Sequence, residues 1–233
     1  MSPETVIRTT ADHVKGSALS LPPGQAGSGH DWWHVERVWQ TAKLIGQKVQ
    51  ADMLVVELAA LLHDIADHKF HGGDETAGPR TARTWLESQH VDEGVVVHVC
   101  EIIRDLSFKG ASVSSSMRTL EGMVVQDADR LDALGAIGIA RAFAYGGYKG
   151  HEIYNPDVPP AHHETFDQYK KSTSPTINHF YEKLLLLKDR MNTTPARELA
   201  EKRHEFMLEF LERFYGEWQG AASEAHRGAN LHS

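Results

Sequence analysis

Two adjacent polar residues follow an almost entirely apolar stretch of the chain. Residues 54–62 (LVVELAALL) contain one glutamate among apolar side chains, a pattern typical of a helix buried on most of its sides. His63 and Asp64 come directly after it. A charge at the end of a buried helix is unfavourable unless it is paired or binds a metal ion. We therefore expect His63 and Asp64 to bind a metal; a helix that ends in solvent after Leu62 is the alternative.

A second histidine, with a charged neighbour one helical turn away, precedes this stretch. In the segment GHDWWHVERVW, residues 29–39, His34 and Arg37 are three residues apart and so share a helix face. We expect His34 to be a further metal ligand. His30 is a weaker candidate because it precedes the helix. The alternative for His34 is a surface histidine at a helix start.

Four charged residues are crowded between two apolar runs in residues 123–140 (MVVQDADRLDALGAIGIA). They are Asp127, Asp129, Arg130 and Asp132. One arginine cannot neutralise three carboxylates, so these side chains need a further partner. A metal ion bound by one of these carboxylates would supply one. The alternative is an exposed acidic corner between two helices.

The three clusters together supply two imidazoles and two carboxylates, from His34, His63, Asp64 and Asp129. Mixed nitrogen and oxygen ligands suit one divalent first-row ion, with water or a substrate oxygen in the open positions. Such an ion lowers the pKa of a bound water and polarises a phosphoryl oxygen. This is the chemistry of phosphate-bond hydrolysis.

Helical periodicity runs through the whole chain and predicts an all-α fold. No run of alternating β-branched residues is long enough for a strand. We read a helix within residues 1–20, a loop over 21–29, one compact helical domain over 27–219 and a disordered tail over 220–233. The predicted helices are 2–19, 31–49, 53–67, 76–88, 92–106, 117–127, 129–145, 176–190 and 195–218, with long loops at 107–116 and 146–173.

Composition limits the classes of partner. The formal net charge of −8 argues against a nucleic-acid binder, which needs a basic face. No apolar run is long enough to cross a bilayer, and the N-terminus lacks a signal-peptide pattern. The single cysteine, Cys100, cannot form an internal disulfide, which fits a cytoplasmic location. The expected partner is a small-molecule phosphate ester, with no nucleic acid or membrane.

The order of these motifs resembles the HD superfamily of metal-dependent phosphohydrolases, whose signature is H…HD…D. His34 matches the first histidine, His63-Asp64 the doublet, and Asp129, in the setting ADRL, the last aspartate. Longer segments, among them GSGHDWWHVERVW, LLHDIADHKF and LEGMVVQDADRLDALGAIGIARAFAYGG, look like a bacterial subfamily reported as manganese-dependent nucleoside triphosphate pyrophosphohydrolases. The similarity covers about residues 27–218. It implies a helical HD domain with its metal site between core helices.

The resemblance implies hydrolysis of a nucleoside triphosphate, preferably a deoxynucleotide, to a monophosphate and pyrophosphate. The implied metal is Mn, with Mg, Co, Ni, Fe or Zn as alternatives. Asp67, one turn beyond the doublet, is the predicted group that orients or deprotonates the attacking water. Cations near the ligands are predicted to offset phosphate charge, and a Tyr- and Lys-rich helix end to line the substrate pocket. The catalytic cations are Arg37 and Lys69, and the substrate-binding residues are Lys109, Arg130, Tyr145 and Lys149.

Each of these substrate residues also has an ordinary structural explanation. Arg37 could pair with Asp31 or Glu36, Arg130 with Asp127, and the lysines could be solvated surface groups. Within the same class, a phosphomonoesterase acting on nucleoside monophosphates or other small phosphate esters is the alternative activity. From another class, the chain could be a catalytically silent metal-binding module. Trp32, Trp33 and Trp218 are expected to pack in the core, and the chain to be a monomer or a homodimer.

Overall fold

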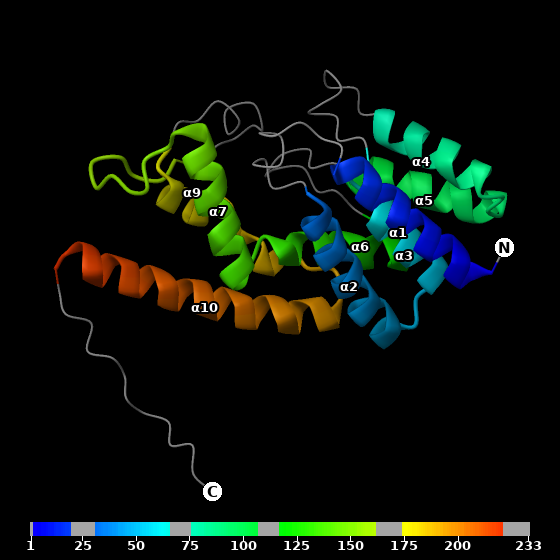
Figure 1. Cartoon of the computed structure of the whole chain (residues 1–233). Coiled ribbons are helices and arrows are strands. Elements are labelled where there is room, and N and C mark those ends of the chain that lie inside the picture. The colour runs from blue at the N-terminus through cyan, green and yellow to red at the C-terminus, as the bar shows by residue number, and fades with distance from the viewer. Residues whose placement is uncertain (1, 20–30, 66–75, 107–116, 162–173, 221–233) are drawn as a thin grey trace, which may run out of the picture.

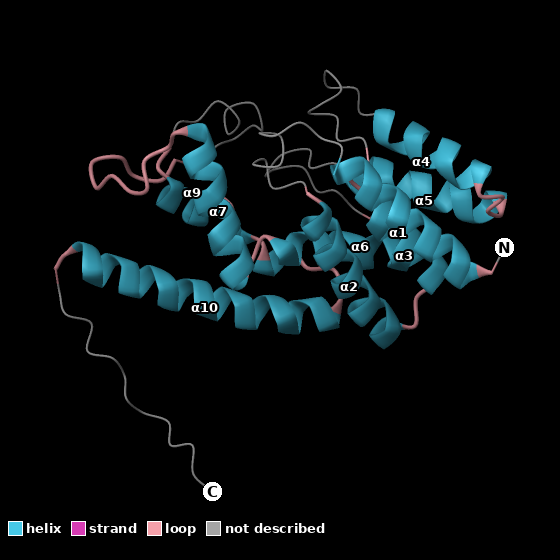
Figure 2. Cartoon of the chain, viewed as in Figure 1, coloured by secondary structure: helices cyan, strands magenta, loops and turns pink. Residues whose placement is uncertain are grey.

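A computed structural model describes residues 2–19, 31–65, 76–106, 117–161 and 174–220, and among these residues every regular element is helical (Figures 1 and 2). The prediction of an all-α fold is therefore confirmed. None of the described helices is both long enough and apolar enough to span a bilayer. The elements are α1 (Pro3–Leu19), α2 (Trp32–Val49), α3 (Met53–Leu62), α4 (Ala77–Ser88), α5 (Glu93–Leu106), α6 (Leu120–Asp132), α7 (Gly135–Lys149), α9 (Thr176–Glu182) and α10 (Thr194–Trp218), with 3₁₀ turns η3 (Leu184–Leu186) and η4 (Lys188–Arg190).

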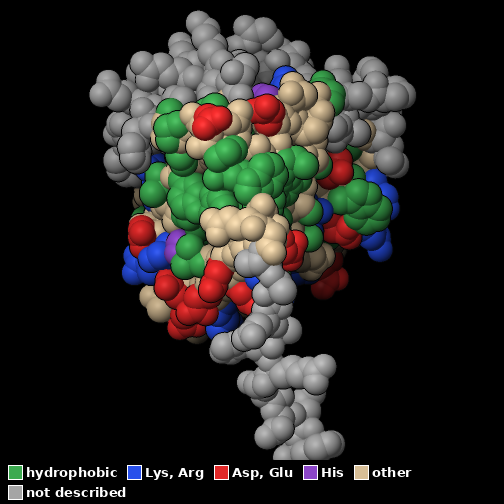
Figure 3. Space-filling view, turned by 90° about the vertical axis from the view of Figure 1, so that its left-hand side faces the viewer, with side chains coloured by type: hydrophobic (Ala, Val, Ile, Leu, Met, Phe, Trp, Pro, Cys, Tyr) green, Lys and Arg blue, Asp and Glu red, His purple; other side chains and the backbone are tan. Residues whose placement is uncertain are grey.

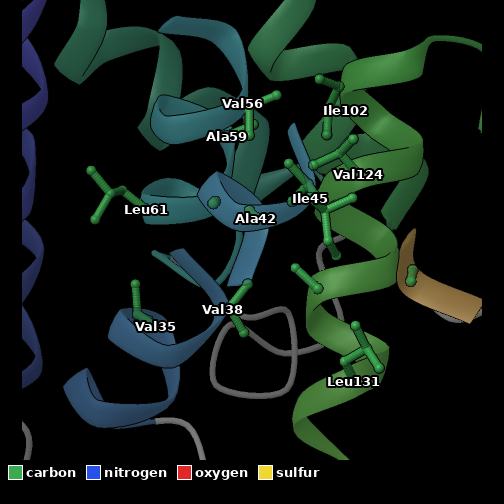
Figure 4. Close-up of a cluster of buried hydrophobic side chains, with 14 of the residues drawn as sticks. Val35, Val38, Ala42, Ile45, Val56, Ala59, Leu61, Ile102, Val124 and Leu131 are labelled. Carbon is green, nitrogen blue, oxygen red and sulfur yellow. The ribbon is translucent and has the colours of Figure 1, made fainter. Parts of the chain in front are cut away.

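Helices α2, α3 and α6 form the centre of the molecule. Helix α2 packs against both of the others, while α1 and α5 cover α3 (Figure 1). Val38, Ala42 and Ile45 of α2 are fully buried against side chains of α3 and α6, as Figure 4 shows. Residues 58–62 of α3 are also without exposed surface. The burial of α3 on all sides confirms the apolar pattern of its sequence and fixes the position of the residues that follow Leu62.

Side-chain caps fix the starts of the two helices that lead to the predicted metal ligands. The Asp31 carboxylate accepts a hydrogen bond from the backbone N–H of His34 at 2.9 Å. The Asp52 carboxylate accepts from the N–H groups of Leu54 and Val55 at 3.0 and 3.4 Å. Each cap satisfies N–H groups that have no partner within the helix. The register of α2, and with it the position of His34, is therefore set locally.

The break between the sixth and seventh helices lies at Ala133 and Leu134, not at residue 128 as predicted. Helix α6 continues through the charged cluster to Asp132, and Gly135 then opens α7 with φ +71°. An exposed corner between two helices was the alternative for these charges, but their partners come from other elements and the backbone stays helical there. Asp129 and Asp132 consequently share one helix face.

Two of the predicted helices, in contrast, end earlier than expected. Helix α3 ends at Leu62 rather than at residue 67, and residues 63–65 form a turn. The predicted helix 176–190 ends at Glu182 and continues as two 3₁₀ turns. In a 3₁₀ turn residues three apart face the same side, which allows both Leu184 and Leu187 to be buried. The predicted loop 21–29 and the tail after residue 220 lie outside the described residues.

Aromatic residues cluster at the C-terminal end of α10. The ring of Tyr154 lies 5.0 Å from that of Trp218 and 5.4 Å from that of Tyr215, measured between centroids. Figure 3 shows apolar side chains gathered on this end of the molecule. Trp218 is 53% exposed and Trp33 60%, whereas Trp32 is buried. The expectation of core packing was therefore right for Trp32 and wrong for the other two tryptophans.

A buried carboxylate attaches the start of α10 to α6. Asp127 has no exposed surface and accepts hydrogen bonds from the backbone N–H of Asn192 at 2.8 Å and from the N–H and hydroxyl of Thr193, both at 2.8 Å. Thr193 is the N-cap of α10, where a negative charge is favoured by the helix dipole. Asp127 therefore does not need Arg130 as its partner; that guanidinium donates to the Arg190 carbonyl.

Replacing Asp127 with Ala should destabilise the fold, because buried donors of residues 192 and 193 lose their acceptor. We expect the free energy of unfolding to fall by about 3 kcal/mol, measured by urea unfolding followed by circular dichroism. Asp189→Ala is the matched control, since that side chain is 73% exposed and pairs only at the surface. The control should change stability by less than about 0.5 kcal/mol. Equal losses in both variants would contradict this account of Asp127.

Candidate metal centre

Four side chains from the central helices meet at one point. His34 comes from α2, His63 and Asp64 from the turn after α3, and Asp129 from α6. The Nε2 atom of His34 lies 3.3 Å from His63 Nε2 and 3.5 Å from both Asp64 Oδ2 and Asp129 Oδ1. His63 Nε2 also lies 3.5 Å from Asp64 Oδ2. All four residues predicted as ligands are thus brought together.

The hydrogen bonds on the far side of each imidazole determine its tautomer. His63 Nδ1 lies 2.8 Å from the carbonyl of Ala60, which can only accept, so Nδ1 carries the hydrogen. His34 Nδ1 lies 2.7 Å from Asp132 Oδ2, and the same reasoning applies. In the neutral imidazoles both Nε2 atoms therefore present lone pairs toward the meeting point.

The meeting point suits a divalent metal ion. Two imidazole nitrogens and two carboxylate oxygens converge there, and acceptor atoms at such distances repel each other unless a proton or a cation lies between them. Ligand atoms about 2.0–2.2 Å from one ion lie about 3.0–3.5 Å from their neighbours, which agrees with the separations of His34 Nε2 from His63, Asp64 and Asp129. The donor set is one that first-row divalent ions accept. The residues present therefore fit a metal, with His34, His63 and Asp129 forming its compact three-residue core.

Electrostatics around His34 also favour a positive charge. Burial by itself lowers the pKa of the His34 imidazole, but Asp132, Asp64 and Asp129 together raise that pKa to about 9. In the absence of a metal, the imidazole is therefore protonated at neutral pH. A metal ion and this proton compete for the same nitrogen, so metal binding must release a proton.

Asp132 is a buried carboxylate with three cationic or polar partners. It accepts from Arg37 Nε at 2.6 Å, from Arg37 Nη2 at 3.0 Å and from Arg141 Nη1 at 2.5 Å, besides facing His34 Nδ1. Burial would raise the pKa of Asp132, but the hydrogen bonds from His34 and Arg37 hold it well below its usual range. Arg37 thus pairs with Asp132 rather than with Asp31 or Glu36, and its role toward phosphate stays a prediction.

The remaining predicted site residues fall into two groups. Asp67, Lys69, Lys109 and His30 lie outside the described residues. Tyr145 and Lys149 lie on the last turns of α7, where Lys149 Nζ is 5.7 Å from the Tyr145 ring centroid and 5.3 Å from that of Tyr148. Among the described contacts, no hydrogen bond or ion pair joins these three to the four ligands. Arg130 contacts the backbone of Arg190, and its substrate role also stays a prediction.

Sequence reasoning did not assign Asp132 or Arg141 to the site. One signal for Asp132 was present in the spacing: His34 and Arg37 are three residues apart on one helix, and Asp129 and Asp132 are three apart on another. Two helices with such complementary pairs can align both pairs if their charged faces meet. Arg141 carried no comparable signal, because its contact depends on the break between α6 and α7.

Comparisons with known proteins define the family. The HD domain profile matches residues 32–134, which include all four converging residues. Protein YpgQ of Bacillus subtilis is 42% identical over 205 residues, covering 84% of this chain and 88% of that protein. The crystal structure of an HD-superfamily hydrolase from Bacillus thuringiensis is 42% identical, covers 94% of this chain and 99% of its own, and has a TM-score of 0.74.

A further solved structure, YpgQ of Bacillus subtilis in complex with ADP, is 39% identical with a TM-score of 0.69. The match covers 90% of this chain and 98% of the YpgQ chain. The chain belongs to the HD superfamily of hydrolases. It is a metal-dependent phosphohydrolase of the HD type.

The stability of the metal-free protein should depend on pH through His34. Its folded-state pKa of about 9 lies above the unfolded value of 6.5, so protonation stabilises the fold fully below pH 6.5 and this contribution is lost as pH rises through 9. In EDTA, we expect the free energy of unfolding to fall by roughly 2–3 kcal/mol between pH 6.5 and about pH 9.5. His34→Gln should abolish most of this fall; an unchanged pH dependence in the variant would contradict the assignment to His34.

Proposed function

We propose that the chain hydrolyses nucleoside triphosphates to monophosphates and pyrophosphate at one divalent metal ion held by His34, His63, Asp64 and Asp129. The convergence of four acceptor atoms from three central helices carries the proposal. Nucleotide binding by a relative supports the substrate class, since YpgQ of Bacillus subtilis has been solved in complex with ADP. The preference for deoxynucleotides rests on the sequence motifs alone.

We propose Mn²⁺ as the metal, on the basis of the mixed nitrogen and oxygen donors and the subfamily motifs. Mg, Co, Ni, Fe and Zn are alternatives. When bound, such an ion supplies a Lewis acid that polarises a phosphoryl oxygen and lowers the pKa of water. The chain's own contribution is to hold the two imidazoles and two carboxylates in place, with Nε2 of each imidazole directed at the site; His34 gives up its proton when the ion binds. Hydrogen bonds to Ala60 and Asp132 achieve this for the imidazoles.

The remaining residues have proposed roles in proton transfer and charge. Asp67 follows His63 by four residues and is proposed to orient the attacking water and accept its proton. Lys69, Lys109 and Arg130 are proposed to offset phosphate charge. Arg37 presents its Nε and Nη2 to Asp132, so a contact with phosphate would use its remaining Nη1 group.

The exposed end of α7 is our candidate for base recognition. Tyr145 and Tyr148 follow Arg141 by four and seven residues, so all three share one helix face. The contact of Arg141 with Asp132 supports the proposal that this face borders the substrate site. The two rings are 45% and 52% exposed and can stack on a nucleobase. Lys149, near both rings, adds a positive charge.

We propose a cytoplasmic monomer or homodimer that binds no nucleic acid or membrane. The single cysteine supports the reducing compartment. Burial raises the pKa of the Cys100 thiol, and its sulfur donates to the Pro79 carbonyl at 3.4 Å. These are features of a structural thiol rather than a reactive one.

A reconstituted activity screen tests the proposed reaction. Metal-free protein with Mn, Mg, Co, Ni or Zn would be assayed on nucleoside mono- and triphosphates, with pyrophosphate and phosphate measured separately. We expect manganese-dependent pyrophosphate release, and none above background from His63→Ala of equal helical content. Phosphate release from monophosphates would instead establish a phosphomonoesterase. Full activity of His63→Ala in chelating buffer would refute the metal assignment, and silence of folded, metal-loaded protein would favour the binding-module alternative.

Asp67→Asn separates proton transfer from metal binding. The amide keeps the size of the side chain but cannot accept the proton of water, so kcat should fall about 10²–10⁴-fold. Manganese affinity, measured by titration calorimetry, should stay within about twofold of wild type. Normal turnover in this variant would remove Asp67 from the reaction, whereas loss of metal would make it a ligand instead.

A further inference from the structure

We propose that Asp132 is the positioning residue of the metal centre and that Arg37 and Arg141 hold it in that role. The inference rests on the proposed metal site but concerns a group that is not itself a ligand. Asp132 is 3% exposed and lies at the end of α6, in contact with side chains from α2 and α7. Three helices thus meet at one carboxylate.

The geometry of α6 makes this arrangement specific for His34. Asp129 and Asp132, three residues apart on one helix face, face opposite nitrogens of the same imidazole. Asp129 Oδ1 lies 3.5 Å from His34 Nε2, and Asp132 Oδ2 lies 2.7 Å from His34 Nδ1. One helix therefore supplies both a proposed metal ligand and the group that orients a second ligand. A rotation of the imidazole would break the short contact with Asp132.

The hydrogen bond from Nδ1 has two consequences for the other nitrogen. It fixes the tautomer in which Nε2 carries a lone pair, and it increases the electron-donating power of Nε2 toward a cation. His63 obtains the same tautomer from the backbone carbonyl of Ala60, which no substitution removes. Of the two imidazoles, only His34 therefore depends on another side chain for its orientation.

The two arginines together engage both oxygens of Asp132. Arg37 donates from Nε to Oδ1 at 2.6 Å and from Nη2 to Oδ2 at 3.0 Å. Arg141 Nη1 donates to Oδ2 at 2.5 Å, the oxygen that also faces His34. Arg37 follows His34 by one turn of α2, and Arg141 comes from α7. With both oxygens engaged, the carboxylate plane is fixed and the carboxylate remains ionised. A simple ion pair would need one arginine and would not need the histidine.

Asp105 provides a matched control for a merely structural role. Its carboxylate also accepts from two arginines, Arg104 at 3.1 Å and Arg118 at 2.8 Å, and no histidine is hydrogen-bonded to it among the described residues. It lies on α5, which supplies none of the four converging side chains. Removing its charge disturbs an arginine pair without touching His34.

The test measures manganese affinity of the full-length, metal-free chain, by electron paramagnetic resonance titration with MnCl₂. We expect about tenfold weaker binding in Asp132→Asn, which retains one acceptor oxygen, and about 100-fold weaker binding in Asp132→Ala, which retains none. Asp105→Asn should bind Mn²⁺ as wild type does. Circular dichroism of each metal-free variant checks that the helical content is unchanged.

If the Asp132 variants fail to fold, Arg141→Gln takes their place, because its partly exposed side chain donates to the Asp132 carboxylate and is not one of the four proposed ligands. About tenfold weaker Mn²⁺ binding in that variant would support the inference. Wild-type affinity in Asp132→Asn or, where that variant does not fold, in Arg141→Gln would overturn it while leaving the proposed metal site intact. An equal loss in Asp105→Asn would also overturn it. A wild-type chain that binds no Mn²⁺ would overturn the proposed site and this inference together.

Discussion

A buried imidazole must have partners for both of its ring nitrogens, and the centre of this molecule is arranged around one that has almost no exposed surface. His34 is 1% exposed, so water cannot serve either nitrogen. One nitrogen faces Asp132, and the other faces the point where His63, Asp64 and Asp129 converge. Helix α6 thus supplies a partner for each nitrogen, and α2 packs directly against it.

The three aspartates of α6 show how one helix can serve stability and chemistry at once. Asp127 points toward the start of α10 and closes the fold by accepting its N-terminal donors. Asp129 and Asp132 lie on the face toward His34. Asp127 therefore has its partners at the start of α10, whereas Asp129 and Asp132 face opposite nitrogens of one imidazole. Each of the three carboxylates thus has a partner outside its own helix, although only one arginine stands among them in the sequence.

The sequence alone predicted those structural features that have a local cause. Apolar residues through 54–62 predicted the buried helix, and the caps at Asp31 and Asp52 agree with the predicted helix starts. The order of His34, His63-Asp64 and Asp129 predicted which side chains converge. Contacts between distant residues could not be predicted in this way. Asp132 meets His34 across 98 residues of sequence, and Arg141 reaches it only because the helix break falls at Ala133 and Leu134 rather than at residue 128.

The metal centre lies between the central helices, whereas the aromatic face that we propose for base recognition lies on α7. The converging groups lie between helices whose packed faces leave little room for change, since core positions such as Val38 and Ala42 have no exposed surface. The exposed aromatic face of α7 carries no such packing constraint. Arg141 connects the two parts, because it extends from that face to Asp132. If the proposed role of this face in base recognition holds, substitutions on α7 should change substrate preference while the metal centre stays the same.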